Sequence, residues 1–249
     1  MTDLTPEQTF ATLAKSGYLE SLHALAKCMC ATFWWYPDVQ GAGISHNGTV
    51  SFVDTGDRLL ALTNHHVVKQ YLDDRAADTT IKCQFGNMSF EPASRVLGAD
   101  SGLDLAAIDV SSVVVAGTGS SVHTSVSWPP KELMEGEVVI LGGYPGQLRV
   151  PGKDSVEFSF VSFLGQVTSS SPERINISLD LAQAQWSPGP PPVPDFNPGG
   201  ASGGPIFRVK SGPIETLELA GLIYQYGPVL EVVQGQHLSR VTGLGAIFP

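Results

Sequence analysis

The stretch GGASGGPIF, residues 199–207, places one serine, Ser202, between two pairs of glycines and just before an apolar run. Glycine adopts backbone conformations that other residues avoid, and it lets a ligand approach the main chain closely. Consecutive N–H groups in such a turn can point at one developing oxyanion. The stretch therefore suits a reactive serine whose oxyanion hole is formed by the backbone N–H groups of Gly200 and Ser202. A serine in a glycine-rich turn can also belong to an ordinary loop, so other residues must agree.

Two histidines end an apolar run in ALTNHHVV, residues 61–68. A histidine that acts as a general base near neutral pH needs a carboxylate to hold its other ring nitrogen. Asp104, in GLDLAAIDV at residues 102–110, is a candidate because it stands just before a strongly apolar run, where an unpaired carboxylate is costly to bury. The alternatives are a structural histidine and an exposed carboxylate at a strand edge.

The composition favours short strands joined by turns. Charged residues make up only 15% of the 249 residues, whereas the chain contains 27 glycines and 18 prolines. A turn at residues 55–57 separates two apolar runs within 49–68, which indicates a β-hairpin. Further strand-like runs occur at residues 80–85, 105–110, 136–142, 156–163, 175–179, 205–209 and 217–224. The sequence therefore predicts an all-β fold, built as barrels or as a sandwich.

Three other segments depart from this pattern. Apolar residues recur at helical spacing within residues 4–31, which predicts an N-terminal helix that packs across the β structure or docks a partner. The stretch 116–130 is rich in Ser, Thr, Gly and Pro and is a candidate linker between two halves. The proline-rich segment 187–198 is expected to form a stiff, irregular loop, because proline interrupts helices and central strands.

The charge balance and the cysteines restrict the function classes. A formal net charge of −10 argues against a nucleic-acid ligand, which normally requires clustered Lys and Arg. No apolar run reaches the roughly 18 residues of a membrane-spanning helix, and the acidic N-terminus lacks the basic start of a signal peptide. We therefore expect a cytoplasmic protein. Cys28, Cys30 and Cys83 form an odd, sparse set, so free thiols are expected, and no metal or other cofactor is predicted.

Three motifs occur in the chain order His, Asp, Ser: TNHHV at 63–67, DLAAIDV at 104–110 and GGASGGPIF at 199–207. Together they resemble the trypsin-like serine peptidases of the chymotrypsin fold. Among these, the chain is most similar to disulfide-free bacterial members such as the high-temperature-requirement proteases, although no PDZ domain is expected in it. The register of the first motif selects His66 rather than His65. GAGISHNG at 41–48 and EGEVVILGGYPG at 135–146 resemble segments that begin the two barrels of this family.

The resemblance implies two packed six-stranded antiparallel β-barrels with an N-terminal helix. The expected division is a helical extension at 1–39, a first barrel at 40–125 with His66 and Asp104, and a second barrel at 126–249 with Ser202. The implied function is that of a serine endopeptidase, in which Ser202 attacks the peptide carbonyl, His66 transfers the proton and Asp104 orients the imidazole. A protein or peptide substrate is expected to bind as an added strand along Ile223, Tyr224, Gln225 and Tyr226.

The chain departs from secreted members of this family at Ala201, where they carry an aspartate that pairs with a newly cut N-terminus. Activation by such a cut is therefore not expected. Cleavage specificity stays open, because Asp195, Phe196 or Tyr226 could each shape the primary pocket. Two alternatives to the endopeptidase are a catalytically inactive binding module of the same fold and an esterase-like hydrolase. The G-x-S-x-G pattern of α/β hydrolases is formally matched, but those enzymes place the acid and the histidine after the serine.

Overall fold

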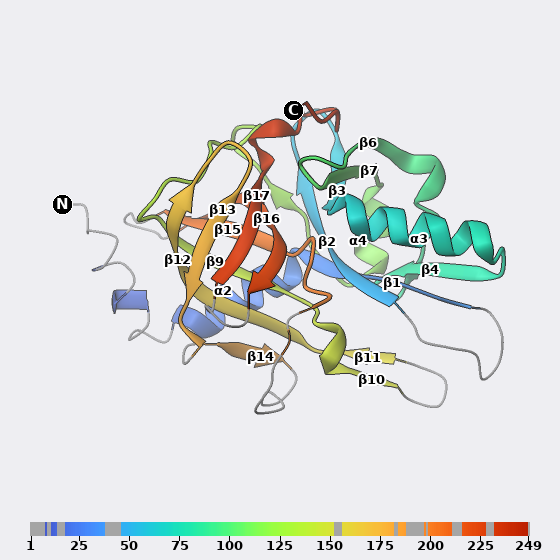
Figure 1. The fold of residues 1–249 in the computed structure, drawn as a ribbon, viewed down its shortest axis with the longest axis horizontal. Helices are drawn as coiled ribbons and strands as arrows, with labels where there is room; N and C mark the ends of the chain where they lie inside the picture. Colours follow the sequence, from blue (N-terminus) through green and yellow to red (C-terminus); the bar gives the residue numbers. More distant parts are fainter. Residues whose placement is uncertain are drawn as a thin grey trace.

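The computed structural model describes residues 8, 11–13, 18–37, 46–151, 156–181, 184–187, 197, 199–210, 216–227 and 232–248. This part of the chain is mostly β and forms two antiparallel sheets that lie side by side (Figure 1). The helices are α2 (Tyr18–Cys28), α3 (His65–Ala77) and α4 (Ser112–Gly117), with 3-10 turns η1 (Ala93–Arg95), η2 (Gly146–Leu148) and η4 (Leu238–Arg240). No helix in these ranges combines the length and apolarity needed to cross a bilayer.

The first sheet comes from the N-terminal half and has the order β5-β4-β1-β2-β3-β7-β6, with β8 pairing in parallel with β2. Its strands are β1 (Cys30–Pro37), β2 (His46–Asp54), β3 (Leu59–Thr63), β4 (Ile81–Phe85), β5 (Met88–Ser89), β6 (Val96–Asp100), β7 (Leu105–Asp109) and β8 (His123–Thr124). Strands β2 and β3 form the hairpin predicted around residues 55–57. Helix α3 follows the end of β3 after the single residue Asn64.

The second sheet closes on itself. Its strands are β9 (Val138–Gly143), β12 (Phe160–Ser170), β13 (Ile175–Leu179), β14 (Gln185–Ser187), β15 (Pro205–Lys210), β16 (Thr216–Gly227) and β17 (Val232–His237). The order β13-β17-β16-β15-β9-β12 returns to β13 through the β12–β13 pairing, so six strands form a barrel, and β14 adds to β12. Strands β10 (Arg149–Pro151) and β11 (Val156–Phe158) form a separate two-stranded ribbon.

The prediction of two closed six-stranded barrels is therefore correct for the second half and wrong for the first. Among the described residues no ladder joins β5 to β6, and the first sheet is open. Strand β5 has only two residues and pairs with β4. The C-terminal segment lies along β6 instead, since a Cβ on Gly98 would stand 2.6 Å from the Gly245 carbonyl oxygen and 3.2 Å from the Ile247 nitrogen. Because a Cβ points out of the plane of a sheet, this segment covers one face of β6.

The N-terminal helix is confirmed as α2 in its described part, but the structure ends it earlier than predicted. Strand β1 begins at Cys30, within the range 1–39 assigned to the helical extension, and pairs with both β2 and β4. The candidate linker 116–130 contains β8. The division into two domains stays a prediction. Residues 41–45 of the first family-like segment and nearly all of the proline-rich segment 187–198 lie outside the described residues.

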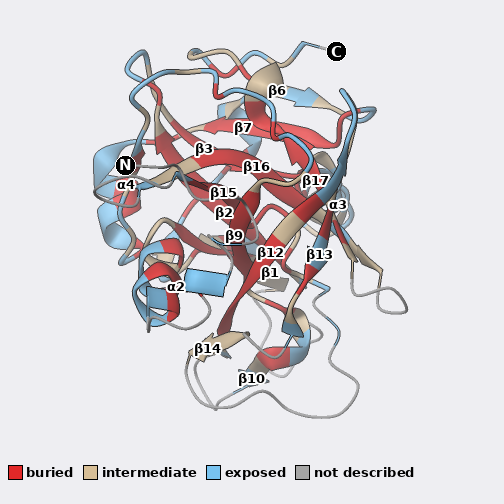
Figure 2. Cartoon of the chain, turned by 90° about the vertical axis from the view of Figure 1, so that its left-hand side faces the viewer, coloured by how far each residue is buried: buried red, intermediate tan, exposed pale blue. Residues whose placement is uncertain are grey.

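Buried residues run through the central strands of both sheets, whereas exposed residues gather on the helices and loops around them (Figure 2). Helix α2 buries Leu19, Leu22 and Ala26 in a core that includes Val138 and Phe160 of the barrel. This burial explains why the amphipathic pattern of 18–28 forms a helix at this place, because packing of an apolar face supplies most helical stability. The helix therefore packs across the barrel.

Candidate functional site

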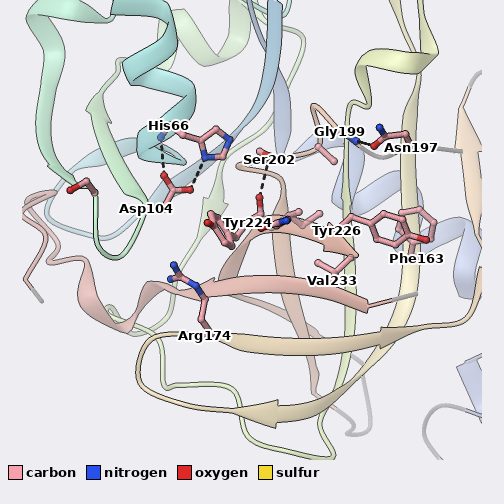
Figure 3. Close-up of a pocket in the computed structure, with 14 residues that line it drawn as sticks. His66, Asp104, Phe163, Arg174, Asn197, Gly199, Ser202, Tyr224, Tyr226 and Val233 are labelled. Carbon is pink, nitrogen blue, oxygen red and sulfur yellow. Dashed lines mark hydrogen bonds and ion pairs between the residues drawn. The ribbon is translucent and has the colours of Figure 1, made fainter. Parts of the chain in front are cut away.

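A pocket of about 470 Å³ is lined by residues of both halves of the molecule (Figure 3). The first half contributes His66, Ser101 and Asp104, and the second half contributes Phe163, Arg174, Asn197, Gly199, Ala201, Ser202, Ile223, Tyr224, Gln225, Tyr226 and Val233. Every site residue predicted from the sequence therefore lines this pocket except Gly200. Gly200 stands between two residues that do line it. Asp195 and Phe196, considered for specificity, lie outside the described residues.

His66 is held by Asp104 through two hydrogen bonds. The backbone N–H of His66 donates to Oδ1 of Asp104 over 2.8 Å, and Nδ1 of the ring lies 2.7 Å from Oδ2. An ionised carboxylate only accepts hydrogen bonds, so these contacts assign the proton to Nδ1 and leave Nε2 as the acceptor. The Asp104 side chain is 8% exposed, whereas that of His66 is 49% exposed. The imidazole is accessible to a ligand and its partner is not.

The start of helix α3 explains why Asp104 takes this position. The first N–H groups of a helix have no partner inside the helix. Asn64 is the N-cap residue, but its side chain makes no capping bond, and the carboxylate of Asp104 accepts one of the free N–H groups instead. An anion at a helix N-terminus is also favoured by the helix dipole. The Asn64 amide donates to the Asp104 carbonyl over 3.0 Å, which ties the two segments together from the other side.

Asp104 has a left-handed backbone with φ of 51°. This region is unfavourable for most side chains and is tolerated best by Gly, Asn and Asp. Strand β7 begins at the next residue, so the turn places the carboxylate at the strand end instead of on one face of the sheet. Asn64 is fully buried and was missed by the sequence reasoning, although it lies inside the histidine motif itself.

Ser202 lies in a tight loop whose shape depends on two glycines. Gly200 and Gly203 have φ of 99° and 84°, which a residue with a Cβ adopts only at a cost. The Ser202 carbonyl accepts from Thr49 N–H over 2.8 Å, and Gly203 N–H donates to the Ile223 carbonyl over 2.9 Å. Within the described chain, the backbone N–H groups of Gly200 and Ser202 donate to no acceptor. The Ser202 hydroxyl donates to the Tyr224 carbonyl over 3.2 Å, and it makes no hydrogen bond to His66.

Three polar side chains at alternate positions of strand β2, Asn47, Thr49 and Ser51, bond to the second half of the chain, and the last two bond to the serine loop itself. The Thr49 hydroxyl donates to the Gly200 carbonyl over 3.2 Å and accepts from Tyr144 N–H over 3.0 Å. The Ser51 hydroxyl donates to the Gly203 carbonyl over 3.0 Å. The Asn47 amide donates to the Tyr144 carbonyl over 2.8 Å. The first sheet therefore fixes the serine loop of the second half.

These three residues were also missed from the sequence. The available signal was the recurrence of polar residues at every second position from 47 to 51 of HNGTVSFVD, residues 46–54, beside the apolar Val50, Phe52 and Val53. Residues two apart in a strand point to the same face. Ser51 is 1% exposed and Thr49 is fully buried, so this polar face is turned inward, where each group needs a partner.

Strand β16 offers a backbone edge to the pocket. Its pairing with β15 ends at Leu222, and Ile223 N–H donates to the Gly204 carbonyl over 2.8 Å. From Tyr224 to Tyr226 the strand pairs with β17 on one side only. The pocket lies on the other side, beside Ser202. Phe163, Val233 and Tyr226 gather at one end of the pocket, and Arg174 lies at the other end beside Tyr224 (Figure 3).

The described cysteines supply no alternative nucleophile at this site. Cys28, Cys30 and Cys83 are free, as predicted, and none of them lines the pocket. Burial raises the pKa of the Cys30 thiol and that of the Cys83 thiol. A buried thiol with a raised pKa is unreactive.

Residues 47–213 match a family model described as a trypsin-like peptidase domain. One solved structure similar to the chain is the active form of the Rv3671c protease from M. tuberculosis, with a TM-score of 0.43, 15% sequence identity and coverage of 89% of this chain and 82% of that one. No curated protein matches the chain.

Proposed function

Because the chain belongs to the trypsin-like peptidase domain family, we propose that it is a serine endopeptidase that works through an acyl-enzyme intermediate. The observation that carries the proposal is the 2.7 Å contact between His66 Nδ1 and Asp104 Oδ2, made beside the same pocket that Ser202 lines. A peptide or protein is the substrate, and the cysteines found free support the likeness to disulfide-free members of the family.

In the first step Ser202 Oγ attacks the peptide carbonyl while its proton passes to Nε2 of His66. Asp104 stabilises the resulting imidazolium. The oxyanion of the tetrahedral intermediate accepts hydrogen bonds from the N–H groups of Gly200 and Ser202, and one such donor contributes about 2.7–4 kcal/mol in the transition state. The proton then moves from His66 to the leaving amine. Water, deprotonated by His66, hydrolyses the acyl-enzyme and restores the serine.

The hydrogen bond from Ser202 to the Tyr224 carbonyl suggests how the substrate assembles the reactive arrangement. A peptide that binds as a strand along Tyr224–Tyr226 needs carbonyls on this edge as acceptors for its own N–H groups. When a substrate N–H donates to the Tyr224 carbonyl, it displaces the Ser202 hydroxyl. The hydroxyl can then rotate and donate a hydrogen bond to Nε2 of His66. Catalytic hydrogen bonds are often incomplete before substrate binds, so the resting geometry is compatible with activity.

Phe163, Val233 and Tyr226 form the end of the pocket that receives the substrate side chain just before the cleaved bond. They therefore determine which residue is preferred at that position. These side chains are apolar or aromatic, and no described lysine, arginine or carboxylate stands among them. A charged side chain would lose its hydration there without gaining a charged partner among the described residues. We therefore propose an apolar residue at this position of the substrate.

The proposal is tested by incubating the folded protein with diisopropyl fluorophosphate and measuring its intact mass. Wild type is expected to gain one adduct, and the variants Ser202→Ala and His66→Ala to gain none. Ser101→Ala is the matched control, because Ser101 lines the same pocket outside the glycine loop, and it should label like wild type. Circular dichroism confirms that each variant is folded. A folded wild-type protein that stays unlabelled between pH 6 and 9 overturns the proposal.

The second candidate is a binding module that keeps the fold without turnover. It is favoured by one observation, the bond of the Ser202 hydroxyl to the Tyr224 carbonyl rather than to His66. That candidate predicts peptide binding without any adduct. An esterase-like hydrolase predicts an adduct and hydrolysis of activated esters, with peptides left uncut, so peptide cleavage separates it from the endopeptidase.

A further inference from the structure

Arg174 lines the pocket at the end away from Phe163 (Figure 3). It ends a tight turn that leads into β13. In this turn Ser171 N–H donates to the Arg174 carbonyl over 2.9 Å, and Arg174 N–H donates to the Ser171 hydroxyl over 3.1 Å. The backbone of Arg174 is therefore fixed. Its Cζ lies 4.5 Å from the centroid of the Tyr224 ring, which supports the guanidinium from one side.

The guanidinium of Arg174 has hydrogen-bonding capacity left over. Its one hydrogen bond to a described residue runs from Nη1 to the Glu173 carbonyl over 2.9 Å, and no described carboxylate forms an ion pair with it. Arg208 shows the opposite case, because it is buried and bonded to both Glu137 and Glu218. A guanidinium carries five N–H donors in a planar fork, a geometry that matches a carboxylate.

Arg174 also supplies the accessible charge of the pocket among the residues described. Asp104 is the one described carboxylate in the lining, but it is buried, and both of its oxygens accept hydrogen bonds from His66. A ligand in the pocket therefore meets the positive charge of Arg174 and is shielded from the negative charge of Asp104. This local positive charge is opposite in sign to the formal net charge of the whole chain, which is −10.

We propose that Arg174, supported by Tyr224, binds an acidic side chain of the substrate a few residues before the cleaved bond. This rests on the proposed function, because the position is counted from Ser202 and His66. The Tyr224 ring contacts both His66 and Arg174, with its centroid 6.3 Å from that of the His66 ring and 4.5 Å from Arg174 Cζ. An extended peptide advances about 3.3 Å per residue. The residue that reaches Arg174 is therefore the second, third or fourth before the cleaved bond.

The expected preference is moderate. A partly exposed ion pair contributes little, and a charge-assisted hydrogen bond contributes more, so a glutamate should raise kcat/KM about three- to tenfold over a glutamine. Stacking on Tyr224 favours the paired state because the planar guanidinium is already oriented. Added salt should reduce the preference, since it screens a partly exposed ion pair.

The test uses fluorogenic peptides with a fixed apolar residue before the cleaved bond and Glu, Gln or Lys at each of the three preceding positions. Wild type is expected to prefer Glu over Gln and Gln over Lys at one of these positions. Arg174→Gln should remove the preference, and Arg174→Glu should reverse it. The matched control is Arg95→Gln, because Arg95 also lies over an aromatic ring, 5.6 Å from Phe90, and does not line the pocket. That variant should keep the wild-type preference.

Failure of the subsite and failure of the proposed function give different results. Peptides that are cleaved without regard to charge overturn the subsite and leave the endopeptidase standing. An equal loss for all peptides in Arg174→Gln also overturns it, since that result assigns the residue a role in the support of Tyr224. If no peptide is cleaved, anisotropy of the labelled peptides with Ser202→Ala measures binding directly. Equal affinity for Glu and Lys peptides then overturns the subsite, and tighter binding of Glu peptides that Arg174→Gln abolishes supports it.

Discussion

One carboxylate holds His66 at both its backbone and its ring: Asp104 accepts the main-chain N–H of His66 on Oδ1 over 2.8 Å and faces Nδ1 with Oδ2 over 2.7 Å. The first contact caps helix α3, and the second sets the tautomer of the imidazole. The position and the orientation of the ring therefore depend on the same side chain. A substitution that keeps the first contact and spoils the second can separate structure from chemistry.

Asp104→Asn makes this separation. The amide oxygen can still accept the His66 N–H, but the amide nitrogen then faces Nδ1 and donates to it, which moves the ring proton to Nε2. A histidine in that tautomer cannot take the serine proton, and the loss in kcat should be about 10⁴-fold. Peptide hydrolysis and the rate of labelling by diisopropyl fluorophosphate measure this loss, and the melting temperature should change little.

Asp109→Asn is the matched control for this change. Asp109 lies in the same strand β7, but its carboxylate is partly exposed and pairs with Arg58 over 3.5 Å. An exposed ion pair contributes at most about 1 kcal/mol, so labelling should remain at the wild-type rate. A similar loss of activity in both variants would contradict a special role for Asp104.

Thr49→Val tests the clamp that strand β2 places on the serine loop. Valine keeps the shape of threonine but cannot accept from Tyr144 N–H or donate to the Gly200 carbonyl. A buried group left without a partner costs about 1–3 kcal/mol, and the Gly200 peptide loses a contact that orients it. We expect a lower melting temperature and a fall in kcat about tenfold or more, with KM changed less.

The control for this prediction is Thr32→Val. Thr32 is also a buried threonine of the first sheet, but its hydroxyl makes no hydrogen bond to a described residue. This variant should keep both its stability and its kcat. An equal fall in kcat for the two variants would show that the Thr49 hydroxyl does not act through the serine loop.

The pairing of His66 with Asp104 could be predicted from the sequence, because both residues lie in short motifs. Asp104 and His66 are 38 residues apart, yet each occurs at the boundary of an apolar strand, and the order of the motifs links them to Ser202. The runs predicted at 136–142, 175–179, 205–209 and 217–224 correspond to the barrel strands β9, β13, β15 and β16, because each is a short apolar run bounded by turns. Strand β17 was missed, since VVQGQH contains only two apolar residues. The N-terminal strand β1 was missed, although CATFWWYP is rich in the aromatic residues that strands favour, because the helical pattern before it was extended too far.

The remaining features depend on contacts between distant parts of the chain. The hydroxyls of Thr49 and Ser51 bond to carbonyls 151 and 152 residues away, and no local pattern specifies those partners. The close approach of Gly98 in β6 to Gly245 and Ile247 also joins segments that are far apart in the chain, and strand propensities do not determine it. Arg174 gave no signal in the sequence, because its importance comes from the ring of Tyr224 beneath it.

Gly203→Ala should damage the site through crowding rather than through backbone strain alone. Gly203 has φ of 84°, and a Cβ there would collide with the Thr49 carbonyl oxygen and with the Thr63 hydroxyl. Gly119 has a similar φ of 78°, but a Cβ there has nothing within 4 Å. Gly119→Ala therefore measures the left-handed backbone cost by itself, about 1–2 kcal/mol.

We expect Gly119→Ala to lower the free energy of unfolding by that amount and to label at the wild-type rate. Gly203→Ala should lose more stability and most of its labelling, because β2 and the serine loop must move apart. Urea unfolding and labelling with diisopropyl fluorophosphate, run on the same samples, check both outcomes. Equal effects of the two substitutions would show that close packing against Thr49 does not shape the loop.

His237 makes the stability of the protein depend on pH. It is 2% exposed, Leu133 N–H donates to its Nδ1 over 3.3 Å, and its Nε2 lies 3.1 Å from the Ser171 carbonyl. These partners suit a neutral ring with its proton on Nε2. Burial lowers the pKa of His237 below the ordinary 6.5, against an opposing effect of Glu132.

Near pH 6.5 His237 becomes protonated in the unfolded chain, whereas in the folded chain it stays neutral until the pH is lower. The contribution of His237 to the free energy of unfolding is therefore complete above this pH and declines as the pH falls. The pKa values of His23 and His123 are also lowered by burial, which adds to the decline in the same direction. Urea unfolding at pH 7.5 and pH 5.5 should therefore show a lower free energy of unfolding at the acidic pH, by at most about 1.4 kcal/mol per histidine and pH unit. His237→Gln should be less stable at pH 7.5 and should lose less on acidification than wild type. Equal stability of the wild-type protein at the two pH values would mean that these rings are protonated as readily in the fold as outside it.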